Sequence, residues 1–344
     1  MAPSSKVNVA IVGYGYWGPN LVRNYIDLPG VAIELVCDER VSQLEKAHAR
    51  YPSLPLTRRY DEVLGSGDVD AVVLATPIST HFHLAKSALE AGKHVFVEKP
   101  MTAESGQAAE LVELARERDL TLMVGHTFVY SPPVRKVFDY VHGGELGDIY
   151  FIATSRVNLG LHQRDVSVIW DLAPHDISIL DYWLGEAPSS VSVTGRACLN
   201  PKLADVAFIN LKYPSGVIAE VQVSWLSPVK LRRTMVVGSK KMLVYDDTQS
   251  VEKVKVFDHG VDFRDPSDFG EFQLSYRTGD IIAPKIDNTE PLLLEAQHFV
   301  DAVSNGHHPL TDGRAGLEVV ATVEAAERSL REGGCEVKIV LPEA

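Results

Sequence analysis

The chain has 344 residues, of which 45% are hydrophobic and 23% are charged, as in an ordinary folded protein. Its 46 acidic and 33 basic side chains leave a net charge of −13, which argues against binding to a nucleic-acid backbone or to an anionic membrane surface. The three cysteines are far apart, so the sequence predicts neither a disulfide framework nor a structural metal site, and it favours a reducing cytoplasm. We expect no secretory signal and no transmembrane helix, because the start is polar and no long apolar run occurs.

The first third of the chain alternates short apolar strands with helices. This rhythm is typical of a doubly wound parallel sheet with right-handed crossovers. Strands are predicted over residues 7–12, 33–37, 71–75, 94–97 and 120–124, and helices after Pro19 and over 41–50, 80–91 and 103–118.

The rhythm changes at the Ser131-Pro132-Pro133 segment. Beyond it the sequence predicts a short helix to about 142, a strand over 148–157, a helix over 168–184, strands over 190–196, 205–213, 217–225, 233–238, 241–246 and 251–257, and helices over 291–304 and 314–332. Hairpin turns are predicted at Gly216 and at residues 240–241. Successive strands flanked by helices indicate a large, mostly antiparallel open sheet with helices on one face. We therefore predict an α/β domain over residues 1–128 and an α+β domain over residues 129–344.

A glycine cluster follows the first predicted strand and opens the first predicted helix. Its spacing, Gly13-x-Gly15-x-x-Gly18, with Asp38 at the end of the second strand, is that of a dinucleotide-binding turn. The glycines allow a tight turn, a close approach of the backbone to a pyrophosphate, and close helix–strand packing, while the helix N-terminus attracts the phosphates. The alternative is a glycine turn that binds nothing. Asp38 favours NAD through the adenosine ribose, whereas Arg40 could pair with the 2′-phosphate of NADP.

Polar residues also follow two other predicted strands, at the edge where open parallel sheets bind ligands. Glu98-Lys99-Pro100 follows one strand, and beyond the predicted boundary Asp171 and His175 share one face of a helix. Together these side chains suit proton transfer coupled to hydride transfer. A histidine takes the hydroxyl proton, a lysine stabilises the developing alkoxide, and an aspartate orients the imidazole or holds a second hydroxyl.

Each of these residues also has a plainer interpretation. His175 could be a satisfied buried histidine, Asp171 and His175 a surface pair, and Lys99 a surface residue. A metal site made of His81, His83 and His175 lacks the usual ligand spacing, so no metal is predicted. The neighbouring dinucleotide turn favours the catalytic interpretation.

These segments resemble the Gfo/Idh/MocA oxidoreductase family over essentially the whole chain. The resemblance rests on VGYGYWG (12–18), ATPxxxH (75–81), VEKP (97–100) and DLAPH (171–175). It implies a Rossmann domain, followed by a substrate-binding and oligomerisation domain that supports a homodimer or homotetramer. It also implies that Lys99 contacts substrate and nicotinamide, that His175 is the acid/base, and that Asp171 is its preceding acid. Many relatives carry a branched residue where this chain has Pro174, which can shift the local helix start. The predicted cofactor-binding residues, including those that the resemblance places beside the nicotinamide, are Gly13, Gly15, Tyr16, Trp17, Gly18, Asp38, Arg40, Thr76, Pro77, His81, Glu98 and Lys99.

The segments at 224–233, 236–247 and 274–292 look like those of bacterial members that act on nucleotide-linked sugars. Arginine side chains suit a pyrophosphate, and aromatic rings can stack on a sugar or a base. The alternative is that the cations, Lys230 among them, are solvated strand residues. The predicted substrate-binding residues are Lys99, Tyr130, Arg156, Asp171, His175, Trp225, Arg232, Arg233, Tyr276 and Arg277.

The leading hypothesis is an NAD-dependent dehydrogenase that oxidises C3 of a nucleotide-linked hexose such as UDP-N-acetylglucosamine. The ketone formed would suit a partner aminotransferase. The alternatives are an NADPH-dependent 3-keto-dTDP-sugar reductase, a dehydrogenase of free sugars or inositol, and a non-catalytic sensor that binds a dinucleotide.

Overall fold

The computed structural model describes residues 6–160, 166–263 and 274–342, and the chain forms two compact units. The first unit comprises Met1–Tyr130, Thr289–Ala321 and Leu341–Ala344, and the second comprises Ser131–Asn288 and Thr322–Val340. The sequence predicted a division between residues 128 and 129, close to the first of these boundaries, with everything beyond it in one domain. The structure instead returns Thr289–Ala321 to the first unit, because helix α8 (Pro291–Asn305) packs against that unit's helix α1 (Gly18–Ile26) and strand β1 (Val7–Val12).

The first unit contains a six-stranded sheet in the order β3-β2-β1-β4-β5-β6, and all neighbouring strands are parallel. This confirms the doubly wound parallel sheet. The remaining strands are β2 (Val31–Cys37), β3 (Leu56–Thr57), β4 (Ala71–Leu74), β5 (His94–Glu98) and β6 (Leu122–Gly125). The remaining helices are α2 (Val41–Arg50), α3 (Tyr60–Gly65), α4 (Ile78–Glu90), α5 (Ser105–Glu117) and the 3-10 helix η1 (Thr127–Tyr130).

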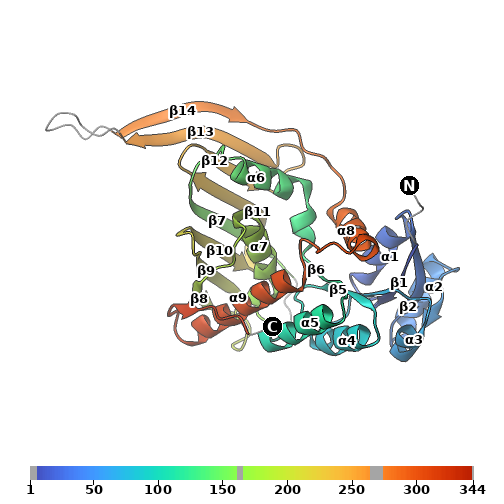
Figure 1. Ribbon diagram of the computed structural model, residues 1–344. Coiled ribbons are helices and arrows are strands. Elements are labelled where there is room, and N and C mark those ends of the chain that lie inside the picture. Colours follow the sequence, from blue (N-terminus) through green and yellow to red (C-terminus); the bar gives the residue numbers. More distant parts are fainter. Residues whose placement is uncertain (1–5, 161–165, 264–273, 343–344) are drawn as a thin grey trace. The chain divides into compact units, whose positions relative to one another are not determined.

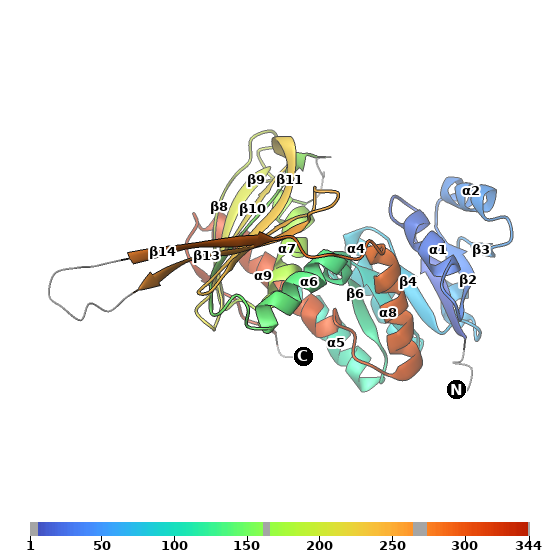
Figure 2. The same ribbon diagram turned by 90° about the horizontal axis from the view of Figure 1, so that it is seen from above.

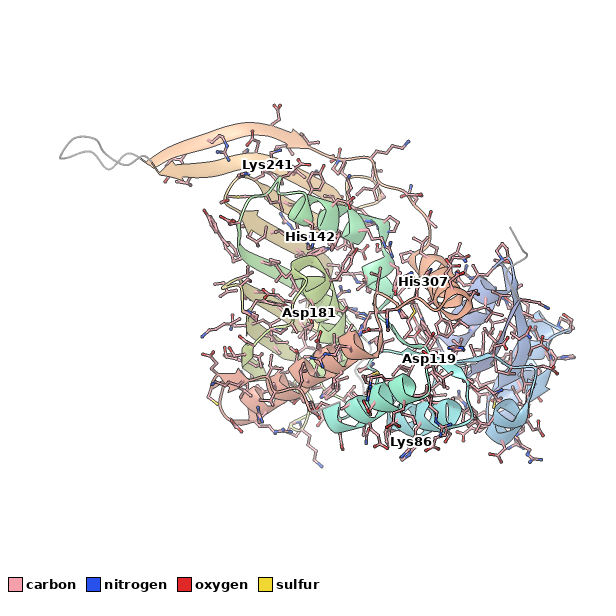
Figure 3. All side chains as sticks on the ribbon, viewed as in Figure 1. Lys86, Asp119, His142, Asp181, Lys241 and His307 are labelled. Atoms are coloured by element: carbon pink, nitrogen blue, oxygen red, sulfur yellow. The ribbon has the colours of Figure 1, made fainter. Side chains whose placement is uncertain are left out.

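Helices cover both faces of this sheet, which is why its central strands are apolar throughout. Helices α1 and α8 lie together on one face, and α4 and α5 lie together on the other (Figure 1). All four residues of β4 are buried, as expected for a central strand. On the outer side, Lys86 Nζ on α4 lies 2.6 Å from Glu110 Oε1 on α5 (Figure 3).

The second unit contains a nine-stranded sheet in the order β14-β13-β12-β11-β7-β10-β9-β8-β15. Strand β7 pairs with β10 in parallel, and the other neighbouring strands of this sheet are antiparallel. This confirms the mostly antiparallel sheet. The strands are β7 (Ile149–Leu159), β8 (Ser190–Arg196), β9 (Val206–Lys212), β10 (Ile218–Ser224), β11 (Leu226–Gly238), β12 (Met242–Asp246), β13 (Val254–Phe263), β14 (Leu274–Ile282) and β15 (Val337–Lys338).

Helices α6 (Pro132–His142) and α7 (Val168–Leu184) pack against this sheet on one face (Figure 2). Strand β9 shows the resulting alternation, because Ala207, Ile209 and Leu211 are buried and the residues between them are exposed. Helix α9 (Gly313–Arg331) runs from the first unit into the second.

The sequence did not predict strand β14, and it shortened strands β11 and β13. Strands β13 and β14 form a hairpin at the edge of the sheet, and the described side chains of β14 are largely exposed. Because one flank of this hairpin has no strand partner among the described residues, β14 shows little of the apolar alternation that marks a buried strand.

Helix α7 begins well before Pro174 and continues through it. Ser167 caps the first turn by accepting a hydrogen bond from the Ile169 backbone N–H at 3.2 Å, and Gly185, with φ of 69°, ends the helix. Pro174 therefore lies inside the helix and does not set its start, because the cap at Ser167 does so.

Candidate functional site

The turn between β1 and α1 contains three glycines, and packing explains two of them. Gly13 has φ of 96°, and a Cβ there would overlap the carbonyl oxygen of Ala75. A Cβ on Gly18 would overlap the carbonyl oxygen of Gly13. A Cβ on Gly15 would meet, among the described atoms within 4 Å, only Nη2 of Arg40, at 3.4 Å. The interior thus does not require glycine at position 15, whereas the close approach of a pyrophosphate does.

The start of helix α1 is open to an anion. Trp17 occupies the cap position, and its side chain makes no capping hydrogen bond to any residue that the structure describes. Pro19 stands in the first turn, where its missing N–H costs nothing. Tyr16 is 89% exposed beside this turn. The first-turn N–H groups and the positive end of the helix dipole could therefore hold a phosphate.

Asp38, at the end of β2, is a buried carboxylate aimed at the same turn. Its Oδ2 accepts the Tyr14 backbone N–H at 2.8 Å, and its Oδ1 accepts the backbone N–H and Nε of Arg40 at 2.9 and 3.2 Å. Burial raises the pKa of Asp38, but the hydrogen bonds from Arg40 and Tyr14 outweigh it and hold that pKa below its usual value. The carboxylate is therefore ionised, as a ribose-binding acceptor must be.

His81 connects the two loops that follow strands β4 and β5. Its Nδ1 lies 2.8 Å from the Pro100 carbonyl oxygen, and its Nε2 lies 2.8 Å from the Thr76 carbonyl oxygen. Burial lowers the pKa of His81, although both carbonyl partners favour a protonated ring. His81 thus holds the Thr76-Pro77 segment close to the end of the Glu98-Lys99-Pro100 segment, whose Lys99–Pro100 peptide bond is cis.

Two buried titratable residues that the sequence analysis missed lie near Glu98 and Lys99. Burial raises the pKa of Glu98 to about 7, against the lowering influence of the Lys99 ammonium and the Trp17 indole. His126 follows strand β6, and burial lowers its pKa to about 3, assisted by the Lys99 charge. Glu295 comes from α8, and burial together with the Glu98 charge raises its pKa well above the usual value.

A local signal for Glu295 was present in the sequence. It lies within the apolar stripe of α8, which buries Leu292, Ala296 and Phe299. A single acid in such a stripe must be neutralised or paired. No comparable local pattern distinguishes His126 from an ordinary strand-end residue.

In the second unit, helix α7 carries Asp171, His175 and Asp176, and side chains outside the helix bond to both carboxylates. Asp171 Oδ2 accepts the Trp225 indole N–H at 2.9 Å. Asp176 is buried and accepts Nε and Nη2 of Arg156 at 2.6 and 3.1 Å. His175 is half-buried and lies between these two carboxylates in sequence.

The predicted substrate residues lie in different environments. Tyr130 is buried, with its hydroxyl 3.0 Å from Thr311 Oγ1, and Trp225 is also buried, so neither ring is exposed for stacking. Tyr276, by contrast, is 76% exposed.

The predicted cations differ as well. Arg156 makes the buried ion pair described above. Arg232 contacts Asp247 at 3.3 Å, and Arg277 contacts Asp258 at 3.1 Å. Arg233 is exposed. The carboxylate partners of Arg232 and Arg277 would compete with a bound anion.

Within residues 6–160, 166–263 and 274–342, no group of three or more His, Cys, Asp and Glu side chains is placed to hold a metal ion. In the same segments, the helices include none with the length and apolar character needed to cross a membrane. Cys37 is buried, and Cys198 and Cys335 are exposed, all as free thiols.

Two family models match the chain. The model "Oxidoreductase family, NAD-binding Rossmann fold" matches residues 7–126, and the model "Oxidoreductase family, C-terminal alpha/beta domain" matches residues 140–339. Together they cover both sheets.

Similar proteins include several sugar and polyol dehydrogenases. The chain is 27% identical over 341 residues to scyllo-inositol 2-dehydrogenase (NAD(+)) of Bacillus subtilis, covering 95% of each protein. It is 29% identical over 224 residues to UDP-N-acetylglucosamine 3-dehydrogenase of Acidithiobacillus ferrooxidans, covering 63% of this chain and 67% of that protein. The fold matches the crystal structure of GenD2 from gentamicin A biosynthesis in complex with NAD, with a TM-score of 0.82 and 24% identity, over 98% of this chain and 97% of that one.

Proposed function

The chain belongs to the Gfo/Idh/MocA family of NAD(P)-dependent oxidoreductases, and on that premise we propose that it oxidises a ring hydroxyl of a sugar or cyclic polyol with NAD. The observation that carries the proposal is Gly15, whose missing side chain leaves space that the protein interior does not use. That space lies at an open helix N-terminus and near an ionised Asp38, which are the features a dinucleotide requires.

NAD fits this turn better than NADP. Asp38 is ionised and would accept hydrogen bonds from a ribose diol, but it would repel a 2′-phosphate. Arg40 is engaged with Asp38 through both Nε and Nη2, so its charge is already compensated.

The proposed chemistry divides the work among three side chains. Bound NAD would supply the acceptor for the hydride that leaves the carbinol carbon. His175 takes the hydroxyl proton, and Lys99 stabilises the oxygen as negative charge develops on it. Asp171, fixed by Trp225, orients the imidazole or a neighbouring hydroxyl. One C–H and one O–H bond break, and a carbonyl forms.

The finer proposal is that the substrate is a nucleotide-linked hexose oxidised at C3. It is supported by the similarity to a UDP-N-acetylglucosamine 3-dehydrogenase and by the four cations Lys230, Arg232, Arg233 and Arg277 on strands β11 and β14. One observation favours a second candidate, a free polyol or sugar, because Arg232 and Arg277 already have carboxylate partners. The similarity to a scyllo-inositol dehydrogenase extends over nearly the whole chain.

A substrate panel tests both proposals. Purified protein is assayed for NADH or NADPH formation with UDP- and dTDP-hexoses, free hexoses and inositols. We expect turnover with NAD in preference to NADP, and a nucleotide-linked hexose as the best substrate. A free inositol as best substrate would favour the second candidate, and a strong NADP preference would contradict the cofactor assignment.

Lys99→Ala and His175→Ala test the catalytic assignment. Loss of a positioned acid/base costs about 10²–10⁴ in rate, so we expect kcat to fall by that order while NAD binding stays nearly unchanged. The control is Lys86→Ala, because Lys86 pairs with Glu110 on the outer side of the sheet (Figure 3). Turnover by either site variant at the level of this control would remove that residue from the mechanism.

A further inference from the structure

Helix α8 carries the carboxyl group of Glu295, which is fully buried inside the first unit. Glu295 is 0% exposed. Its Oε2 accepts a hydrogen bond from the Thr127 hydroxyl at 2.7 Å, and its Oε1 has no hydrogen-bond partner among the described residues. A buried carboxylate with a single neutral donor is poorly compensated for the loss of water.

The surroundings of Glu295 contain a second carboxyl group. Glu98, at the end of β5, acts on it electrostatically, and the Glu98 carboxyl group lies so close to Gly125 that a Cβ there would be 3.1 Å from Glu98 Oε2. Tyr25, on the facing side of α1, is fully buried and also experiences the charges of both acids. The other titratable groups nearby are Lys99, adjacent to Glu98, and the buried His126.

Glu295 is fully buried and the Glu98 charge acts on it, and two carboxyl groups in such a region do not both ionise, so the pair retains a proton. The charges around them decide which acid holds it. Glu98 has the Lys99 ammonium, which favours its ionised form. Glu295 instead accepts a hydrogen bond from the Thr127 hydroxyl, and the charge of Glu98 disfavours its ionisation.

We propose that Glu295 is a positioning residue that stays a neutral carboxylic acid, so that it and Glu98 together present at most one negative charge to Lys99. This inference rests on the proposed function, since Lys99 matters because it is proposed to act on the substrate oxygen. Neutral Glu295 limits the negative charge near that ammonium, and its hydrogen bond with Thr127 fixes α8 beside the end of β6. A second negative charge there would attract the Lys99 ammonium toward the interior.

The test compares Glu295→Gln with Glu290→Gln. Glu290 lies just before the same helix, but it is half-exposed and ion-paired with Arg23 at 2.6 Å, which lowers its pKa. Unfolding by urea is followed for both variants and the wild type at pH 5, 7 and 9, with the full chain.

The stabilities of the two variants relative to wild type are expected to depend on pH in different ways. Glu295 keeps its proton in the folded protein but loses it above about pH 4.3 when unfolded, so the wild type loses stability as pH rises. Glutamine does not titrate, so the folding constant of Glu295→Gln should rise relative to wild type by up to about tenfold per pH unit. Glu290→Gln should be less stable than wild type by a nearly constant amount from pH 5 to 9, because Glu290 has a lowered pKa when folded and a pKa of about 4.3 when unfolded, so it titrates below this range.

The measured quantity is the folding constant of Glu295→Gln divided by that of the wild type. Its change with pH decides the outcome, because a difference in packing would shift this ratio equally at every pH. A ratio that stays constant, or that falls as pH rises, overturns the proposal. The kinetic measurement compares kcat/KM of Glu295→Gln and Glu295→Ala. We expect Glu295→Gln to retain much more kcat/KM, because the alanine side chain cannot accept the hydrogen bond from Thr127. Equal kcat/KM in these two variants would also overturn it. Because the unfolding measurement needs no substrate, absence of turnover in the panel would refute the proposed function alone, and a flat slope would refute this inference alone.

Discussion

At the scale of single residues, Gly15 and Gly18 are needed for different reasons: Gly15 for the proposed cofactor and Gly18 for packing of the turn. Both belong to one turn and one sequence motif, yet a side chain at Gly18 would overlap the backbone of Gly13, and one at Gly15 would meet only the end of Arg40. A flexible guanidinium can move aside, whereas a backbone carbonyl in a tight turn cannot. The same added methyl group should therefore have different consequences at the two positions.

We predict that Gly15→Ala folds normally but binds NAD at least about tenfold more weakly, a loss of about 1.4 kcal/mol. The methyl group would occupy the space where the pyrophosphate approaches the backbone. Urea unfolding should show a change within about 1 kcal/mol of wild type, since no backbone atom is displaced. Calorimetric titration with NAD gives the affinity.

Gly18→Ala is the matched control. Its methyl group must push apart α1 and the turn, which should cost about 1–3 kcal/mol or more of stability. A stable Gly15→Ala protein with wild-type NAD affinity would contradict the assignment of this turn to the pyrophosphate.

At the scale of elements, α7 owes its position to a buried ion pair. Arg156 on β7 and Asp176 on α7 make two hydrogen bonds, and Asp176 also accepts the Thr154 hydroxyl at 3.2 Å. Thr234 on β11 donates in turn to Thr154 at 2.9 Å. This network joins two strands to the helix turn that carries His175, so it positions a proposed catalytic group without exposing Arg156 to substrate.

We predict that Arg156→Met and Asp176→Asn each destabilise the protein by about 3–5 kcal/mol, because each leaves a buried charge without its partner. The double variant should be less destabilised than the sum of the two, since neither charge then remains. A double-mutant cycle by urea unfolding measures the coupling free energy. Additive losses would show that the two side chains do not act as a pair.

The same elements show what the sequence could predict. Local patterns sufficed for β1, for the glycine turn and for α7, because apolar runs, turn residues and helical spacing act over short distances. Arg156 was predicted to bind substrate, and nothing in the local sequence indicates its ion-pair partner. That partner, Asp176, is 20 positions away and becomes apparent only when the helix lies on the sheet. For Glu295 the apolar stripe indicated burial, but its hydrogen-bond partner Thr127 is 168 positions distant and was not evident.

At the scale of the whole molecule, the nucleotide-binding unit is discontinuous in sequence. Helix α8 returns to it after every strand of the second sheet except β15. Phe299 on α8 is buried and packs edge-to-face on Phe96 of β5, with ring centroids 5.7 Å apart. The Arg23–Glu290 ion pair joins the same two parts of the chain. The core of the Rossmann sheet is thus completed by a segment that a linear division at residue 128 assigns elsewhere.

We therefore predict that residues 1–130 alone do not fold cooperatively, whereas residues 1–130 joined by a flexible linker to 289–321 do. Removing α8 exposes Phe96 and the apolar surface that Leu292, Ala296 and Phe299 cover, and burial of one large apolar side chain such as Leu292 or Phe299 contributes about 1.5–3 kcal/mol. Such a loss approaches the whole stability of a small domain, which is about 5–15 kcal/mol.

Far-UV circular dichroism during urea unfolding distinguishes a sigmoidal transition from a gradual one. NAD should raise the transition midpoint of the joined fragment, because a ligand of the folded state stabilises it by mass action. A sharp, NAD-sensitive transition in residues 1–130 alone would show that α8 is dispensable and that the linear division is sufficient.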